Sequence, residues 1–284
     1  MIKNIILMVF LFLFTENLNA ETKTYKMVFV PASEKGDESD YKILISITEK
    51  LTGFNIETIK VTDYNAAVEA MRAGRAHIAW YGGKTYVKAA EIAQAEAFAA
   101  GVRPGEKDAG YYTYFVVKQD SEIKKFDDVK GKVLSLNTIG STSGDLIPQV
   151  ELSKINLSTK NKDHFENVFY AGSHDACLLS VINNQADVCG MSSRNYEARL
   201  EDGTIKLENI RIIHKSDRVP PPPLAYSKLI PKEDRKKIKE AVLDAHNHGQ
   251  VAGYGGKMSH YMEVKDSDYN VLREVIELLN KNKS

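Results

Sequence analysis

The sequence predicts an α/β protein with two similar α/β lobes joined by two crossing segments. Strand-like and helix-like segments alternate along the chain, which is typical of layered domains with a mainly parallel sheet. The alternation runs in two blocks, of which the second covers about residues 118–213. The length of 284 residues suits one large or two modest domains.

The first block starts behind the N-terminal segment. Asp63 is a natural N-cap for the helix that follows it, and Gly74 closes that helix. A short apolar strand stops at Gly82 and Gly83. The predicted strands are 23–32, 54–61 and 77–83, the predicted helices are 41–51, 64–74 and 84–93, and residues 33–40 are expected to form a polar loop.

The second block repeats this order, and helices follow it. Four prolines within residues 216–227 exclude a long helix there, and Pro231 suits the start of an amphipathic helix. The segment 253–257, "GYGGK", is expected to be a loop. The β-rich segments are 110–119, 133–137 and both ends of 166–193, and the helices are a short one near 126, one inside 166–193, and those at 231–248 and 268–282.

The block order predicts where the chain passes between the lobes. The expected crossings lie near residues 112–117 and 215–226, and a cleft at such crossings is where a hinge-closing protein holds its ligand. The predicted division is a signal peptide at 1–20, one lobe from 21–116 plus 216–284, and a second lobe from 117–215.

The N-terminus has the layout of a secretory signal. Lys3 precedes a ten-residue apolar block, and a short polar segment then ends at Ala20. The block is too short for a membrane-spanning helix, although an uncleaved anchor is the alternative. The mature chain is therefore expected to begin at Glu21 and to work in the periplasm.

Composition excludes several classes of partner and site. The 38 basic and 38 acidic side chains balance, so neither nucleic acid nor a membrane surface is indicated. His246 and His248 lie one residue apart and would splay on a helix, so no metal site is predicted, and no cofactor. Cys177 and Cys189 form either a disulfide or two buried apolar positions, and the sequence leaves both open.

The segment "LNTIGSTSGDLIP" (136–148) holds the main candidate site. A strand ending near Asn137 and a helix starting near Ser143 would present backbone N–H groups at a positive helix end. The hydroxyls of Ser141, Thr142 and Ser143 could donate further hydrogen bonds to a tetrahedral oxyanion. The alternative is a simple helix cap with spare hydroxyls.

Three further residues are candidates for the same cleft. His174 stands at the start of a second helix behind "AGS" and could donate to an anion, although a cap or surface role is the alternative. Tyr81 ends an apolar strand, where ligands meet open α/β sheets, and its neighbour Trp80 is either a wall or core. Tyr41 lies near the first helix start. Neither a G-x-S-x-G elbow nor an H-E-x-x-H motif occurs, so no catalytic residue and no enzyme is predicted.

Four segments together resemble the phosphate, phosphite and phosphonate-binding periplasmic proteins of ABC importers, the PhnD-like family. They are "DYNAAVEAMRAGRAHIAWYGGKTYVKA", "FDDVKGKVLSLNTIGSTSGDLIP", "GSHDACLLSVINNQADV" and "PPPPLAYSKLIP". The resemblance covers essentially the whole mature chain. It implies a type II periplasmic binding fold, with the hydroxyls at 141–143, His174, Tyr41 and Tyr81 around the phosphonate oxygens.

The sequence departs from the family pattern at two positions. Gly83 stands where the family often has Pro, and Ser192 stands where many members have an acid that can meet a ligand amine. Asp187, Asp40 and Glu38 are the other candidates for an amine partner.

The expected function is capture of a phosphonate or related phosphorus oxyanion, with 2-aminoethylphosphonate favoured, and delivery by a monomer to an ABC permease. The alternatives are a periplasmic sensor for a signalling partner and an enzyme that acts on phosphorylated substrates.

Overall fold

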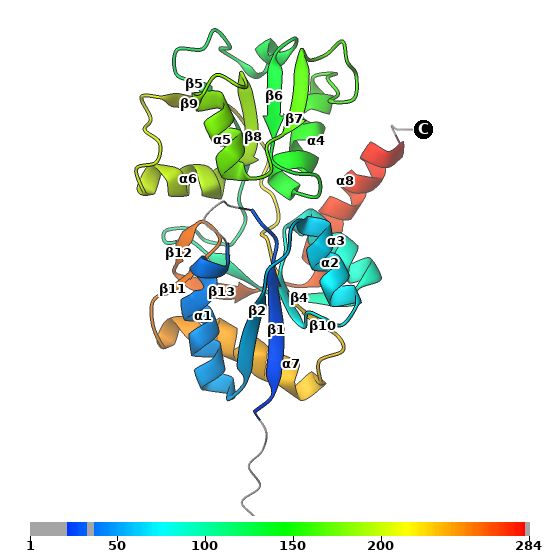
Figure 1. Cartoon of the computed structure of the whole chain (residues 1–284), viewed down its shortest axis with the longest axis vertical. Helices are drawn as coiled ribbons and strands as arrows, with labels where there is room; N and C mark the ends of the chain where they lie inside the picture. Colours follow the sequence, from blue (N-terminus) through cyan, green and yellow to red (C-terminus); the bar gives the residue numbers. More distant parts are fainter. Residues whose placement is uncertain (1–21, 33–36, 282–284) are drawn as a thin grey trace, which may run out of the picture.

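The protein consists of two α/β lobes, one above the other in Figure 1. The structure is a computed structural model that describes residues 22–32 and 37–281. The predicted signal peptide at 1–20 lies outside the described residues. Each lobe has one main β-sheet with helices packed against it, and the connections between the lobes run through the middle of the molecule (Figure 1).

The first lobe is built on a six-stranded sheet in the order β13-β4-β10-β3-β1-β2. The three strands β1, β2 and β3 pair in parallel, as predicted, whereas β10 and β13 are antiparallel to their neighbours, so the sheet is mixed. The strands are β1 (Thr24–Phe29), β2 (Asn55–Ile59), β3 (Ile78–Trp80), β4 (Ala95–Val102), β10 (Leu224–Ser227) and β13 (His260–Glu263).

Five helices and a small hairpin complete this lobe. They are α1 (Asp37–Thr52), α2 (Tyr64–Arg72), α3 (Gly83–Ile92), α7 (Lys232–Asp244), α8 (Asn270–Lys281), and the antiparallel pair β11 (Val251–Gly253) and β12 (Gly256–Met258). Asp63 caps α2 as predicted, since its side chain accepts from the N–H of Ala66. Helix α8 packs on α3 so closely that a Cβ at Gly83 would lie 2.5 Å from Cδ1 of Leu272. A larger residue at position 83 would require the side chain of Leu272 to shift.

The second lobe is built on a five-stranded sheet in the order β7-β6-β8-β5-β9. β6 pairs in parallel with β7 and β8, and β5 is antiparallel to β8 and β9. The strands are β5 (Thr113–Lys118), β6 (Val133–Leu136), β7 (Asn167–Tyr170), β8 (Val188–Ser192) and β9 (Ile210–Lys215). The helices are α4 (Ile147–Lys154), α5 (His174–Ile182) and α6 (Ser193–Glu201).

The first crossing segment lies earlier in the chain than predicted, whereas the second lies within the predicted range. All of β5 belongs to the second sheet, so residues 113–116, which the sequence placed with the first lobe, pair with β8 and β9 instead. The chain therefore passes between the sheets within residues 103–112 and again within 216–223. The two passages touch through a bridge between Tyr111 and Val219.

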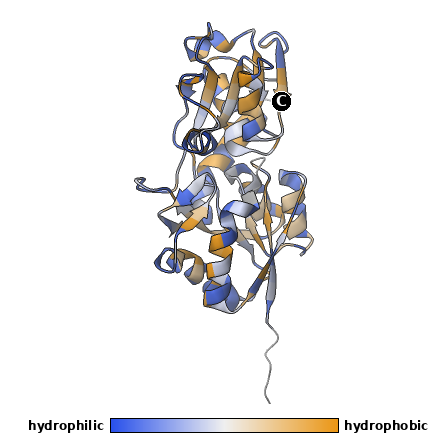
Figure 2. Cartoon of the chain, turned by 60° about the vertical axis from the view of Figure 1, so that its left-hand side comes forward, coloured by the Kyte–Doolittle hydropathy of each residue, from blue (hydrophilic) through white to orange (hydrophobic). Residues whose placement is uncertain are grey.

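Apolar side chains form a core in each lobe, and Figure 2 shows them concentrated on the strands and on the inward sides of the helices. Strand β5 illustrates the pattern, because its alternate residues enter two different clusters. Val116 packs with Cys177 and Met191 on one face, and Phe115 packs with Leu134 on the other. The second sheet is thus buried on both faces, as sheets with helices on both sides are.

Several elements differ from the sequence prediction. Residues 37–40, expected in the polar loop, form the first turn of α1, where acidic residues favour a helix N-terminus. The Ala-rich strand β4 and the short strand β13 were not predicted. The segment 253–257, expected as a loop, instead closes the β11–β12 hairpin.

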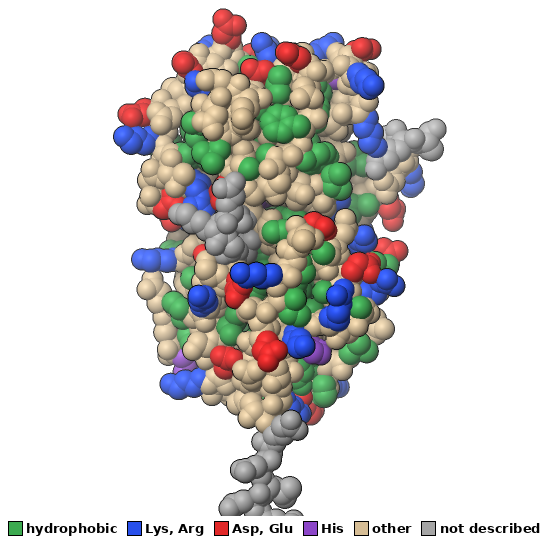
Figure 3. Space-filling view, in the orientation of Figure 1, with side chains coloured by type: hydrophobic (Ala, Val, Ile, Leu, Met, Phe, Trp, Pro, Cys, Tyr) green, Lys and Arg blue, Asp and Glu red, His purple; other side chains and the backbone are tan. Residues whose placement is uncertain are grey.

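The surface carries a mixture of charges (Figure 3), in line with the balanced composition. Lys, Arg, Asp and Glu side chains intersperse over the face seen in Figure 3, with no field of one sign. Among the described residues, the helices are too short or too polar to cross a membrane.

Candidate functional site

The hydroxyl-rich loop lies at the carboxyl end of β6, as predicted. The loop continues into a π-helical turn (Thr142–Leu146) and then into α4. Ser141, rather than a later residue, is the N-cap, and its Oγ accepts from the N–H of Gly144 at 3.1 Å. The turn therefore begins one residue before the predicted helix start near Ser143. Ser141, Thr142 and Ser143 are each only 2% exposed.

Capping does not use up the hydroxyl of Ser141. Its Oγ accepts a second hydrogen bond from Nδ2 of Asn137 at 3.3 Å, which leaves its own proton to be donated. Gly144 permits the tight turn, because a Cβ there would lie 2.3 Å from Cβ of Asn137 and 2.9 Å from Cε1 of His174. The loop thus both caps a helix and offers donors, and it packs directly against His174.

His174 is the first residue of α5 and is buried in the cleft. Ser173 caps α5, and Nδ1 of His174 accepts from the N–H of Ser192 at 3.3 Å. Burial lowers the pKa of His174 to about 3, so the ring is neutral at physiological pH. Because Nδ1 is an acceptor, the proton of the neutral ring is on Nε2, which is then a hydrogen-bond donor.

The first lobe meets this loop with the N-terminus of α3. The backbone N–H of Lys84 donates to Oγ1 of Thr142 at 2.9 Å, and Oγ1 of Thr85 donates to the carbonyl of Gly140 at 2.9 Å. Nζ of Lys84 also forms an ion pair with Asp145 at 2.5 Å. The lobes are therefore closed on each other, and the N-terminus of α3 faces the hydroxyl loop that precedes α4. Helix N-termini carry partial positive charge, so this arrangement favours an anion.

Aromatic rings form a wall beside the loop. Tyr41 packs between Phe29 and Trp80, with ring centroids 5.1 Å and 5.9 Å away, and its hydroxyl accepts from the N–H of Tyr254 at 3.3 Å. Trp80 lies 4.8 Å from the ring of Tyr254, and its buried Nε1 has no hydrogen-bond partner among the described residues. Trp80 is only 2% exposed and belongs to the core cluster of the first lobe, one of the two roles considered for it.

Tyr81 lies on the opposite side of its strand and enters the core of the first lobe. Its hydroxyl donates to the carbonyl of Ala67 at 3.3 Å and contacts Sδ of Met71 at 3.7 Å, both in α2. Burial raises the pKa of Tyr81 well above its usual value. Successive residues of a strand face opposite sides, so Trp80 and Tyr81 cannot both line the cleft. Both side chains are buried in the core cluster of the first lobe, and the hydroxyl of Tyr81 is engaged with α2.

Two residues of this region were not identified from the sequence. Tyr111, in the first crossing segment, is buried, and its hydroxyl lies near the side chains of Ser143 and Thr142. Arg194, in α6, is only 3% exposed and reaches the carbonyls of Gly101 and Ala109. No sequence motif marks either residue, because their partners lie far away in the chain.

The acids considered for a ligand amine lie elsewhere or are engaged. Asp187 accepts from the N–H of Val133, at the start of β6 and away from the hydroxyl loop. Glu38 accepts from Oγ1 of Thr58 at 2.6 Å. Asp40 lines a cavity of about 500 Å³ between α1, α6 and the β11–β12 hairpin. Ser192, the position of an acid in many relatives, caps α6 by accepting from the N–H of Arg194.

A disulfide and a second cavity lie outside the hydroxyl loop. Cys177 and Cys189 form a disulfide that joins α5 to β8, which settles the alternative left open by the sequence. The described part of the chain has no group of three His, Cys, Asp or Glu side chains suited to a metal ion. A cavity of about 810 Å³ lies between α3, α8 and β13, and none of the predicted site residues lines it.

Sequence comparisons place the chain among transport proteins. Residues 27–269 match the family model of the phosphonate periplasmic substrate-binding proteins of ABC transporters. The chain is 30% identical over 209 residues to the phosphonates-binding periplasmic protein of Escherichia coli K12, across 72% of this chain and 59% of that protein. It is 25% identical over 280 residues to the phosphate-import protein PhnD of Mycolicibacterium smegmatis, across 92% and 87%.

Solved structures share the two-lobed fold. A binding protein of a phosphonate ABC transporter from Pseudomonas aeruginosa superposes with a TM-score of 0.78 at 21% identity, across 92% of this chain and 87% of that chain. PhnD1 from Prochlorococcus marinus, solved with methylphosphonate, gives 0.74 at 19% identity, across 91% and 99%. These likenesses confirm the predicted type II fold. With the family match over most of its length, the chain belongs to the periplasmic substrate-binding proteins of phosphonate ABC transporters.

Proposed function

We propose that this protein captures a phosphonate or a related phosphorus oxyanion in the periplasm and, as a monomer, delivers it to an ABC permease. The observation that carries this proposal is the contact of the loop at 140–143 with the N-terminus of α3, where Oγ1 of Thr142 accepts from the N–H of Lys84 and Thr85 donates to the carbonyl of Gly140. Backbone N–H groups and hydroxyls suit the several oxygens of a tetrahedral anion. His174 adds a neutral donor from the start of α5.

Closure of the two lobes brings residues from both of them to the ligand. The contacts of Lys84 and Thr85 join the lobes around the hydroxyl loop, so a ligand that bridges the two sides favours the closed state. Tyr41 and Trp80 provide an apolar wall for the part of the ligand beyond its oxygens. We therefore propose Tyr41, Ser141, Thr142, Ser143 and His174 as the ligand-binding residues. Tyr81 is not carried into this set, because its hydroxyl is engaged in the core.

Calorimetry with methylphosphonate, phosphite, phosphate and 2-aminoethylphosphonate tests the function. At least one of them should bind and raise the melting temperature of the protein, since a ligand that binds only the folded state stabilises it. 2-Aminoethylphosphonate is in this series because the sequence favours it. If none of the four gives heat or a melting shift at millimolar concentration, the proposed function is wrong.

A separate variant tests the site. Ser143→Ala should weaken binding by about 1–3 kcal/mol if its hydroxyl serves a charged acceptor. Ser180→Ala is a matched control, because Oγ of Ser180 is also buried but donates to the carbonyl of Cys177 within α5. If Ser143→Ala lowers stability and leaves affinity unchanged, Ser143 serves only the local structure.

A further inference from the structure

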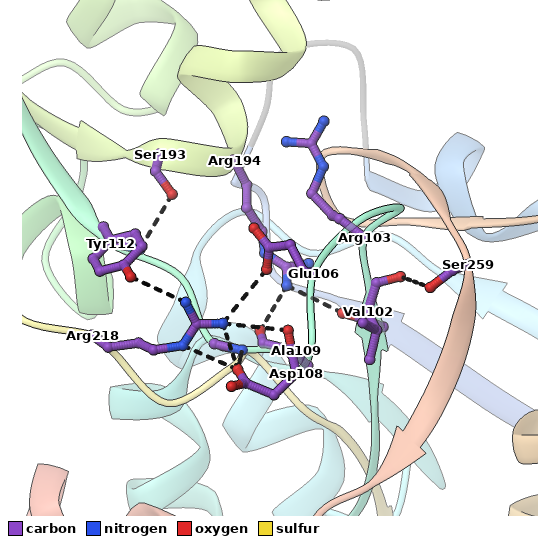
Figure 4. A network of polar contacts seen from close by, with 12 residues as sticks. Val102, Arg103, Glu106, Asp108, Ala109, Tyr112, Ser193, Arg194, Arg218 and Ser259 are labelled. Carbon is purple, nitrogen blue, oxygen red and sulfur yellow. Dashed lines mark hydrogen bonds and ion pairs between the residues drawn. The ribbon is translucent and has the colours of Figure 1, made fainter.

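Arg194 places a buried positive charge beside the proposed ligand site. It projects from α6 of the second lobe, and its Nη2 donates to the carbonyls of Ala109 at 2.6 Å and Gly101 at 3.1 Å. Figure 4 shows the side chain reaching into the segment 101–109. It lies between Arg103 on one side and Arg218, with its partners Glu106 and Asp108, on the other. The side chain therefore spans from one lobe to the other.

Carbonyl dipoles contact this charge directly, while the carboxylate of Glu106, which pairs with Arg218, acts on it from beyond ion-pair distance. Among residues 22–32 and 37–281, no acid lies within ion-pair distance of the Arg194 guanidinium, which instead contacts carbonyls, Sδ of Met258 at 4.0 Å and an aromatic face. The neighbouring acids pair with other arginines. Arg103 binds Glu197 and Glu201, and Arg218 binds Asp108 and Glu106. Burial lowers the pKa of Arg194, but an arginine stays protonated in proteins.

Tyr111 connects this charge to the hydroxyl loop. The guanidinium carbon of Arg194 lies 6.0 Å from the centroid of the Tyr111 ring, while the Tyr111 hydroxyl lies near the side chains of Ser143 and Thr142. The positive charge therefore lies close behind the hydroxyl loop.

The acids nearest the hydroxyl loop and His174 are already neutralised. Asp145 accepts from Lys84, Tyr170 and Gln149. Asp175, next to His174, pairs with Arg199 at 2.8 Å. A ligand ammonium group would have to compete with these partners for a carboxylate, and it would be repelled by Arg194.

From this arrangement we infer that Arg194 makes the cleft select phosphorus oxyanions without a cationic substituent and reject aminoalkylphosphonates. This inference rests on the proposed function and reverses the preference that the sequence favours. Arg194 acts through its field, which strengthens binding of the doubly charged oxyanion and opposes an ammonium group on the same ligand. The ligands expected are methylphosphonate, phosphite, phosphate and short alkylphosphonates.

Pairs of ligands of equal size isolate the charge. Propylphosphonate has the length of 2-aminoethylphosphonate, and ethylphosphonate has the length of aminomethylphosphonate. At pH 9 the phosphonate group is largely doubly ionised in all four ligands and the amines are still protonated, so each pair differs by one ammonium group. A unit charge roughly 9–16 Å from that ammonium group, at an effective dielectric constant of about 20, predicts about 6- to 20-fold tighter binding of the alkyl member. Calorimetry on the wild-type protein measures this ratio directly.

Variants then separate the charge from the hydrogen bonds. Arg194→Gln should bring the ratio within about threefold of one, whereas Arg194→Lys keeps the charge and should keep most of the ratio even where overall affinity falls. Arg211→Gln is the matched control, because Arg211 also binds main-chain carbonyls, at Ser121 and Ile123, but lies away from the cleft. It should leave the ratio unchanged. Circular dichroism confirms that each variant is folded.

The outcomes separate this inference from the proposed function. If no oxyanion binds, the proposed function itself is wrong. If oxyanions bind and the amino member of each pair binds as tightly as the alkyl member, only the role of Arg194 is refuted. The same holds if Arg194→Gln weakens both members equally, or if neither alkylphosphonate binds while smaller oxyanions do, since size then selects the ligand. Should Arg194→Gln fail to fold, the wild-type ratio and Arg194→Lys still decide.

Discussion

Replacement of His174 by Gln should remove a specific sensitivity of the fold to acid. Burial lowers the pKa of His174 from 6.5 to about 3 in the folded protein, so the unfolded chain binds a proton below pH 6.5 that the folded protein does not. Stability is therefore present above pH 6.5 and is lost as the pH falls from 6.5 toward 3. Between pH 7 and pH 5 this linkage costs about 2 kcal/mol.

Urea denaturation of both proteins at pH 7 and pH 5 measures this difference. Gln keeps a polar side chain without a titrating group, so the wild-type protein should lose about 2 kcal/mol more than His174→Gln over this interval. His246→Gln serves as a control, because His246 is an exposed residue on the first lobe. It should behave like the wild type. Equal losses in the wild type and in His174→Gln would refute a buried neutral histidine at this position.

Three further predictions concern the core, the disulfide and the closed cleft. Tyr81→Phe should lower the free energy of unfolding by about 1 kcal/mol and leave ligand affinity unchanged in calorimetry, because the hydroxyl binds within the core. Replacing both Cys177 and Cys189 by Ala should cost about 3 kcal/mol in urea denaturation, the entropy of a closed loop of this length; a loss below about 1 kcal/mol would contradict it. Lys84→Met should weaken ligand binding by about 1–2 kcal/mol, because its pair with the buried Asp145 joins the lobes and Lys84 is partly exposed; unchanged affinity would show that the pair adds nothing to closure.

Much of the fold could be predicted from the periodicity of apolar residues and from capping and turn residues. Asp63 and Gly74 bound a helix that the structure ends within two residues of prediction, and the alternating blocks indicated two α/β lobes. Strand β4 was missed because Ala and Gly dominate "AEAFAAGV", and these residues have little strand preference of their own. Its place between β13 and β10 is set by packing, which local patterns do not encode.

The site could be predicted in part, for a physical reason. The hydroxyls at 141–143 and His174 each follow a strand and precede or start a helix, a local pattern that the sequence shows. The structure buries them and brings the loop into contact with His174, as that pattern predicts. Trp80 ends strand β3 and Tyr81 follows it directly, both in the core of the first lobe, and no polar alternation in this apolar segment indicates which side chain would meet a ligand. Arg194 meets partners about 90 residues earlier in the chain, at Gly101 and Ala109, and that contact exists only in three dimensions.

The disulfide between α5 and β8 has a consequence for the order of binding events. It links α5, which carries His174, covalently to β8, which carries Ser192. Ser141 is held by its bond to Gly144, so the part of the site in the second lobe does not depend on the first lobe for its shape. The first lobe adds Lys84, Thr85 and the proposed contact Tyr41 from the other side of the cleft. The ligand is therefore expected to bind first to the second lobe, and the contacts from the first lobe are expected to set its residence time. Substitutions in the first-lobe contacts should alter the dissociation rate far more than the association rate. A permease that separates the lobes would then release the ligand without changing the second lobe.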